Sequence, residues 1–345
     1  MTCASDETPE SPVLASVVLS DGITTAAAVH AGRFLRLDRL VEGTPATLTD
    51  LVRRWEEFGD TVERALLGAA PRIAEDGAVL REVAVTAPVV GGQTYCAIGN
   101  YRGQLAQAAA DVAAGAGEGS AGDADGRRLR ADLERGWRER RATGAPYVAL
   151  TGSVRIAGPF DPLELSADLT TLDWEVELAA VIGSCGAGLS PHAALDVVAG
   201  YCVANDLTLR GAVFRTDVPA LGGDWLTSKG RPGWLPLGPW LVPASSVPDP
   251  DALGLALRLN GQQMQADRTS DMLFSVAEVI AHVSQHTELR PGDVVCTGSP
   301  AGFGAHYGRY LRAGDVVEAG VERLGTQRFT VVSESAAVGA GHGHS

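Results

Sequence analysis

The chain is most informative at residues 173–182, which read DWEVELAAVI. Side chains of a β-strand alternate between two faces, so we expect Asp173, Glu175 and Glu177 on one face and the intervening apolar residues on the other. The run then stays apolar through Ile182, which is typical of a buried strand. Buried ionised carboxylates are very unfavourable unless a cation compensates them, so the stretch predicts a metal ion or a basic neighbour. An edge strand whose acids face water is the alternative.

A second acidic position supports the metal interpretation. Residues 200–206, GYCVAND, form an apolar run that ends in Asp206. Strand ends lie at the rim of a sheet, where sites are usually built. Carboxylate oxygens are the ligands that Mg²⁺, Mn²⁺ and Ca²⁺ prefer, whereas zinc and copper sites favour nitrogen and sulfur. The pattern therefore indicates a site for a hard divalent cation.

Composition excludes several classes of function. The chain has 345 residues, with 42 acidic and 28 basic side chains and a formal net charge of -14. Such an excess of carboxylate repels phosphate backbones, so we expect no nucleic-acid partner. Apolar runs are too short for a membrane helix, and the N-terminus carries acids where a signal peptide is positive, so we expect no membrane association and a cytoplasmic location. Lys229 is the only lysine, beside 27 arginines.

The order of strand and helix patterns predicts an α+β fold in two parts. Residues 1–90 are expected to form a small N-terminal α+β domain, and residues 91–334 a larger, strand-rich catalytic domain. Residues 335–345 are expected to be a disordered tail. In the small domain the predicted elements are strands at 13–19 and 26–37 and a helix at 47–58.

The larger part shows short strands separated by glycine and proline turns, with a few helical stretches. Its predicted elements are a strand at 95–98, helices at 103–114, 127–141, 191–199 and 275–285, and a hairpin at 255–262. The hairpin prediction rests on Asn260-Gly261, a pair that suits a left-handed two-residue turn. Residues 115–126, GAGEGSAGDADG, are small and acidic and are expected to form a mobile loop.

Several short blocks follow one another along the chain: IGNYR at 98–102, DWEVEL at 173–178, GYCVAND at 200–206, SKG at 228–230, PLGPW at 236–240, NG at 260–261, TSDM at 269–272 and PGDVVCTGSPAG at 291–302. Together and in this order, these blocks resemble the fumarylacetoacetate hydrolase superfamily. The resemblance covers roughly residues 93–332, and the N-terminal part is similar to the small leader domain of longer members. It implies a catalytic domain built as a mixed β-roll or sandwich with flanking helices, and a homodimer.

The resemblance also implies roles for individual residues. In that family the two glutamates of an E-x-E strand and the aspartate that ends a later strand bind the catalytic metal, which here implies Glu175, Glu177 and Asp206 as ligands of Mg²⁺, or of Mn²⁺ or Ca²⁺. The other implied catalytic residues are Lys229, Arg210 and Ser299, and Ser299 stands where threonine is usual in the family. The implied substrate is a small 2-oxo acid or 1,3-dicarbonyl, whose enolate the metal and the lysine would stabilise.

The chain departs from the family where hydrolases activate water. A histidine and a glutamate are typical after the family's N-Y motif, but this chain has Gln104 and Gln107, whose amides cannot take a proton from water at neutral pH. A lysine common in the block after the loop is replaced by Thr151. We expect Gln104 among the catalytic groups and Tyr101, Gln107 and Thr151 at the substrate. His306, which follows the GSPAG loop, is a candidate substitute base.

These matches and departures predict an enzyme that forms a metal-stabilised enolate without an attacking hydroxide. Isomerisation, decarboxylation, dehydration and ring closure all fit that description. One alternative is a C–C bond hydrolase of the fumarylacetoacetate or acylpyruvate type that uses a different base, such as His306. Another is a family member that binds a ligand without turnover, which the three converging acids argue against. Stabilisation by divalent metal would distinguish the enzymes from the binding protein.

Overall fold

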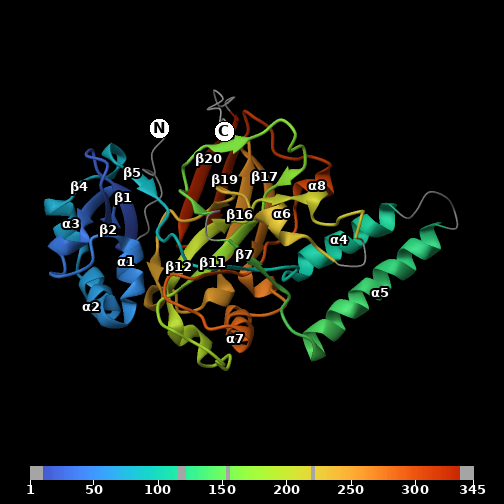
Figure 1. Ribbon diagram of the computed structural model, residues 1–345, viewed down its shortest axis with the longest axis horizontal. Coiled ribbons are helices and arrows are strands. Elements are labelled where there is room, and N and C mark those ends of the chain that lie inside the picture. The colour runs from blue at the N-terminus through green and yellow to red at the C-terminus, as the bar shows by residue number, and fades with distance from the viewer. Residues whose placement is uncertain (1–10, 116–121, 153–155, 219–221, 335–345) are drawn as a thin grey trace, which may run out of the picture.

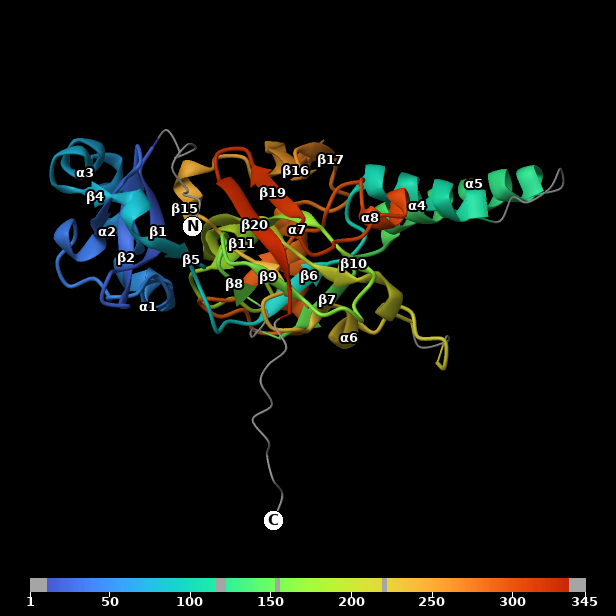
Figure 2. The ribbon, with the colours of Figure 1, turned by 90° about the horizontal axis from the view of Figure 1, so that it is seen from above.

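The computed structural model describes residues 11–115, 122–152, 156–218 and 222–334, and it shows a mixed α+β fold (Figures 1 and 2). The predicted fold class is therefore confirmed. Three large sheets dominate, and helices lie around them (Figure 1). No helix among these described residues is both long and apolar enough to cross a membrane.

The N-terminal part is a five-stranded antiparallel sheet in the order β4-β3-β2-β1-β5, with three helices beside it. Its elements are β1 (Val13–Val18), β2 (Thr24–His30), β3 (Arg33–Arg36), α1 (Leu48–Arg53), α2 (Trp55–Leu67), α3 (Ala70–Asp76), β4 (Ala78–Val79) and β5 (Ala84–Thr86). The strand predicted at 26–37 is two strands, because Ala31 and Gly32 take positive φ angles and reverse the chain. Thr47 caps α1, and the helix predicted at 47–58 is interrupted at Arg54, where α1 ends and α2 begins.

Two further large sheets lie in the rest of the molecule, together with two small ones. The six-stranded sheet, in the order β15-β12-β11-β18-β6-β7, contains β6 (Thr94–Ala97), β7 (Val148–Thr151), β11 (Val176–Ile182), β12 (Val198–Asn205), β15 (Val242–Pro243) and β18 (Val294–Cys296). The five-stranded sheet, in the order β17-β16-β19-β20-β9, contains β9 (Leu163–Leu165), β16 (Gly254–Leu259), β17 (Gln262–Arg268), β19 (Val316–Val321) and β20 (Gly325–Ser333). The two-stranded sheets pair β8 (Ile156–Ala157) with β14 (Leu235–Pro236) and β10 (Leu172–Asp173) with β13 (Thr208–Leu209).

The six-stranded sheet is buried on both faces. Along β11, Leu178 and Ala180 belong to the core shared with the five-stranded sheet, whereas Ala179 and Val181 belong to a core shared with the N-terminal part. This double burial explains why residues 178–182 carry no polar side chain. Leu14 of β1 also exchanges two backbone hydrogen bonds with Leu241, so the N-terminal part is joined to the sheet by pairing as well as packing.

We expect Leu14→Ala to destabilise the protein by about 2–5 kcal/mol, because the side chain is fully buried in the core shared by the two parts. Urea unfolding followed by tryptophan fluorescence measures this loss. The matched control is Leu150→Ala on β7, where the side chain is 62% exposed and a change within about 0.5 kcal/mol is expected. Equal, small effects of the two substitutions would contradict the shared core.

Two local predictions in the larger part are confirmed and one is wrong. Asn260 and Gly261 both have positive φ and join β16 to β17, and α7 (Val276–His286) begins with the capping box of Ser275 and Glu278. The helix predicted at 191–199 is only a short 3-10 turn, Ala194–Val197, after which β12 begins. Val197 and Val198 are β-branched and fit the buried strand better than a helix.

Helices α4 (Arg102–Gly115) and α5 (Gly122–Thr143) form a hairpin that projects from the sheets (Figures 1 and 2). Within the loop predicted at 115–126, residues 116–121 lie outside the described residues, and the described remainder is helical. The base of the hairpin is fixed by Arg140, whose guanidinium donates to the Gly99 carbonyl and lies over the Phe274 ring. The predicted tail, 335–345, also lies outside the described residues.

Candidate metal centre

Three buried carboxylates meet at the ends of two neighbouring strands. Glu177 lies in β11, Glu175 directly precedes that strand, and Asp206 directly follows β12. The antiparallel register pairs Glu177 with Ala204, which brings the start of β11 to the end of β12. One oxygen of each carboxylate lies within 4.8 Å of the others, and all three side chains are buried. The sequence-predicted ligand set therefore forms one cluster.

The sole lysine lies inside this cluster. Lys229 ends α6 (Trp225–Lys229), a short helix capped by Asp224, and only 1% of its side chain is exposed. Its Nζ is 2.5 Å from Asp206 Oδ2 and 3.5 Å from Glu175 Oε2. It also donates to Thr208 Oγ1 at 2.6 Å. A buried ammonium so placed compensates part of the negative charge.

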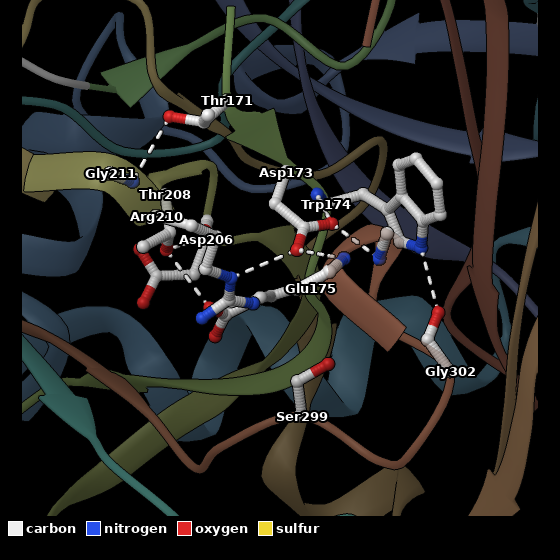
Figure 3. A network of polar contacts seen from close by, with 12 residues as sticks. Thr171, Asp173, Trp174, Glu175, Asp206, Thr208, Arg210, Gly211, Ser299 and Gly302 are labelled. Carbon is white, nitrogen blue, oxygen red and sulfur yellow. Dashed lines mark hydrogen bonds and ion pairs between the residues drawn. The ribbon is translucent and has the colours of Figure 1, made fainter. Parts of the chain in front are cut away.

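Arg210 supplies the second cation. Its Nη2 lies 2.8 Å from Glu175 Oε1, and its Nε donates to Asp173 Oδ2 at 2.9 Å (Figure 3). The guanidinium also lies 4.2 Å from the centre of the Phe303 ring. Burial by itself lowers the pKa of Arg210, but Glu175 and Asp173 outweigh it, so the pKa is raised and the side chain stays charged.

Asp173 does not share the role of the two glutamates, contrary to the simple alternation of the sequence. The chain leaves β10 at Asp173 and enters β11 only at Val176, so the regular alternation is broken between them. Asp173 accepts hydrogen bonds from the backbone of Trp174, Gly304 and Ala305 and from Arg210. It therefore fixes Arg210 and the start of α8 (Gly304–Tyr307) (Figure 3).

Glu177 carries the clearest sign of a cation site. Its Oε2 accepts a hydrogen bond from the Gly298 amide at 2.7 Å, whereas Oε1 is buried without a hydrogen-bond partner among the described residues. Burial raises the pKa of Glu177 well above its usual range, and the neighbouring Asp206 and Glu175 raise it further. Both observations show that the described residues do not compensate the ionised form of Glu177, which a bound cation would do.

The charge and the donor atoms of the cluster fit one hard divalent ion. If the carboxyl groups of the three clustered acids and of Asp173 are all counted as ionised, they stand against the two cations Lys229 and Arg210, and the formal charge is −2. A single divalent ion would balance that charge. The donors are all carboxylate oxygens, which favour Mg²⁺, Mn²⁺ or Ca²⁺.

Ser299 and Tyr101 lie next to the cluster. Ser299 follows Gly298, whose amide contacts Glu177, and it lies on the loop beside the carboxylates in Figure 3. Tyr101 is fully buried, and its hydroxyl has no hydrogen-bond partner within the described ranges. Burial and then the charge of Glu177 raise the pKa of that hydroxyl well above its usual range, so it remains protonated.

The other predicted site residues make contacts elsewhere. Gln107 Oε1 accepts from the Gly302 amide at 2.8 Å and holds α4 to the loop beside the cluster. The Gln104 oxygen lies near Gly99, without a hydrogen-bond partner in the described part of the chain. Thr151 contacts Thr94 and Cys96 in the six-stranded sheet. His306 pairs with Asp111 of α4 at 2.9 Å, and its side chain is 34% exposed. None of these contacts involves the three carboxylates.

Three supporting residues were not predicted from the sequence. Thr208 donates from Oγ1 to Glu175 Oε1 at 2.9 Å, and Asn205 Oδ1 accepts from the Glu175 amide at 3.0 Å. Both lie within two residues of Asp206, so the polar side chains at that strand end were the available signal. Gln265 is 1% exposed and bonds to the E-x-E strand and to Ser299. A register shift in the β16–β17 pair buries consecutive residues there, so simple alternation could not identify it.

We expect Thr208→Val to weaken Mn²⁺ binding about 10- to 100-fold, because Glu175 loses a hydrogen-bond donor and Lys229 an acceptor. Calorimetric titration of the metal-free protein with Mn²⁺ measures the change. Thr216→Val, at an exposed threonine, serves as the control and is expected to bind like wild type. Unchanged affinity in Thr208→Val would show that this hydroxyl does not orient the ligands.

The strand-end carboxylates and their two cations form a candidate enzyme site on an α+β scaffold, and its oxygen donors would suit a hard metal ion. The family described as "Fumarylacetoacetate (FAA) hydrolase C-terminal" matches residues 95–332. The chain therefore belongs to the fumarylacetoacetate hydrolase family of enzymes. It is 40% identical over 189 residues to the 2,4-didehydro-3-deoxy-L-rhamnonate hydrolase of Sphingomonas sp. strain SKA58, over 54% of this chain and 65% of that protein. The match thus spans just under two thirds of the relative's length.

Solved structures of other proteins share the fold of this chain. A Mycobacterium abscessus protein described as a probable 2-hydroxyhepta-2,4-diene-1,7-dioate isomerase has a TM-score of 0.67 at 26% identity, over 94% of this chain and 99% of that one. The maleylpyruvate hydrolase of Sphingobium sp. SYK-6, solved with manganese(II) and pyruvate, has a TM-score of 0.68 at 23% identity, over 94% and 100%. Near-complete coverage shows that the N-terminal part also belongs to the shared architecture.

Proposed function

We propose that this protein is a divalent-metal-dependent enzyme that acts on a small 2-oxo acid or 1,3-dicarbonyl through an enolate. The observation that carries the proposal is the cluster of Glu175, Glu177 and Asp206, in which one buried carboxylate oxygen has no hydrogen-bond partner among the described residues. These three side chains would hold the ion. When bound, the ion would polarise a carbonyl oxygen and stabilise negative charge on it. Manganese and pyruvate in the Sphingobium hydrolase make Mn²⁺ and pyruvate suitable probes.

The protein's own cations would complete the site. Lys229 and Arg210 are both held against the carboxylates by short ion pairs, so they limit the repulsion among the acids and keep them in place. Their positive charge also favours an anionic substrate. Because the cluster is buried, charges there interact more strongly than they would in water.

We also propose a homodimer with this site in each copy, which light scattering after size-exclusion chromatography would test.

The reaction we favour does not use an attacking water. Gln104 and Gln107 occupy the positions where family hydrolases carry a histidine and a glutamate, and neither amide can act as a base. His306 is held by Asp111 at a partly exposed position, and this pairing supports its role as a link between α8 and α4. Isomerisation, decarboxylation, dehydration or ring closure of an enolate is therefore our first candidate.

Hydrolysis of a C–C bond is the second candidate. It is favoured by one observation, the 40% identity to a hydrolase of a deoxy sugar acid. Substrates for the two candidates overlap, since each carries a 2-oxo acid that can enolise.

We expect the Mn²⁺-loaded protein to decarboxylate or isomerise 2-oxo diacids about 100-fold faster than it hydrolyses acylpyruvates, because a missing general base lowers hydrolysis about 10²- to 10⁴-fold. A panel of such substrates, monitored by absorbance and by product chromatography, measures the ratio. Efficient acylpyruvate hydrolysis that Glu177→Ala abolishes and Gln104→Ala leaves intact would instead establish the second candidate.

A further inference from the structure

The side chain of Gln265 connects two parts of the site that are distant in sequence. It reaches from β17 in the five-stranded sheet, and its Oε1 accepts a hydrogen bond from the Val176 amide at 3.1 Å. Its Nε2 donates to the Pro300 carbonyl at 2.8 Å and contacts Ser299 Oγ at 2.9 Å. Gln265 is 1% exposed and Ser299 is 4% exposed, so these bonds form in a dry environment where they are strong.

The chemistry of these partners fixes the direction of each bond. A backbone amide can only donate, so the atom facing Val176 must be the oxygen of Gln265. The nitrogen therefore faces Pro300 and Ser299, and its two hydrogens supply one bond to each. An amide nitrogen has no lone pair to accept with, so Ser299 Oγ is the acceptor in this contact. The hydroxyl hydrogen of Ser299 remains to be donated elsewhere.

That hydrogen has no protein acceptor among the hydrogen bonds of the described residues. The neighbouring Gly298 amide points at Glu177, so the Ser299 hydroxyl lies on the loop that borders the cluster (Figure 3). We infer that Gln265 is a positioning residue that commits the Ser299 hydroxyl to donate to an anionic oxygen of the bound substrate. The inference rests on the proposed function and adds Gln265 as the residue that orients the Ser299 hydroxyl toward the carboxylate or enolate oxygen of a 2-oxo acid.

The test uses pyruvate binding to the Mn²⁺-loaded full chain, measured by calorimetry. Ser299→Ala is expected to weaken pyruvate binding about tenfold, because a hydrogen bond to a charged oxygen is lost. Gln265→Glu keeps the acceptor for Val176 but loses both donors, so Ser299 would donate to the new carboxylate, and a similar tenfold loss is expected. Ser299→Thr keeps the hydroxyl and should bind within about threefold of wild type.

A double-mutant cycle separates positioning from general support of the fold. In the Ser299→Ala background, Gln265→Glu and Gln265→Met are expected to cause no further loss of pyruvate affinity, since the hydroxyl on which Gln265 acts is absent. Gln262→Glu, on the exposed part of the same strand, is the control for added charge. Mn²⁺ affinity is measured for each variant without pyruvate, so that a change in metal binding can be distinguished from a change in pyruvate binding. If the Gln265→Met protein does not fold, the cycle is completed with Gln265→Glu alone.

Two results would overturn the inference. One is wild-type pyruvate affinity in Ser299→Ala, and the other is a full additional loss when Gln265 is changed in that background. Either result leaves the proposed function intact, provided that the wild-type protein binds Mn²⁺ and pyruvate. Failure of the wild-type protein to bind Mn²⁺ would instead refute the proposed metal-dependent function itself.

Discussion

Replacing Glu177 by glutamine is expected to abolish stabilisation by Mn²⁺ and to lower turnover at least about 1,000-fold. Glu177 contributes the buried carboxylate oxygen that has no hydrogen-bond partner within the described residues. A neutral amide oxygen is a weaker ligand, and it leaves the cluster with a smaller negative charge to attract the ion. Thermal unfolding with and without Mn²⁺ measures the first effect, and turnover of the preferred 2-oxo acid measures the second.

The same substitution should leave the metal-free protein at least as stable as wild type. Burial and two acidic neighbours raise the folded-state pKa of Glu177, so its ionised form is destabilising wherever the unfolded chain is already ionised. This penalty is present above the ordinary glutamate pKa and disappears as the pH falls through it. The gain in Glu177→Gln should therefore be largest at neutral pH and shrink below about pH 5.

A matched control is Glu164→Gln, since Glu164 lies on the exposed side of β9. It should keep wild-type turnover and wild-type stabilisation by Mn²⁺. Retention of the Mn²⁺ effect in Glu177→Gln would place the ion elsewhere and remove the basis for the proposed chemistry.

The carboxylate cluster could be located from the sequence because its signals are local. Glu175 and Glu177 stand beside a strand buried on both faces, and Asp206 ends the neighbouring strand, so their meeting required only antiparallel pairing of β11 with β12. The hairpin at Asn260 and the capping box at Ser275 are local in the same sense. Each depends on residues within a few positions along the chain.

What the sequence could not provide depends on contacts between distant segments. The strand alternation predicts that Asp173 lies on the same face as Glu175 and Glu177. In the structure β10 ends at Asp173, and its side chain binds Arg210 instead of joining the three clustered carboxylates. Gln265 lies about ninety residues from the E-x-E strand. It is buried because the register of the β16–β17 pair shifts, and the alternation of polar and apolar residues in β17 does not predict that shift. Residues 191–199 show helical spacing, yet burial in the sheet favours a strand from Val198 onward.

Replacing Lys229 by methionine is expected to destabilise the metal-free protein by about 3–5 kcal/mol, because removing one partner of a buried ion pair leaves charges uncompensated. Its Nζ lies 2.5 Å from Asp206 and 3.5 Å from Glu175, and only 1% of the side chain is exposed. Mn²⁺ should restore part of the lost stability, since the ion supplies positive charge to the same carboxylates. Urea unfolding with and without Mn²⁺ measures both effects.

Turnover in Lys229→Met should nevertheless stay at least about 100-fold below wild type at saturating Mn²⁺, since the ion would not replace the fixed ammonium that we propose stabilises the enolate oxygen. Because Lys229 is the only lysine among 345 residues, isotope labelling of the lysine Nζ atom gives a single side-chain nitrogen signal in the wild-type protein. Titration with diamagnetic Mg²⁺ is expected to shift that signal as the cluster fills. If Mg²⁺ leaves the lysine signal unshifted and Lys229→Met keeps full turnover, the lysine has no part in the site. The presence of this one lysine in an arginine-rich chain would then have another cause.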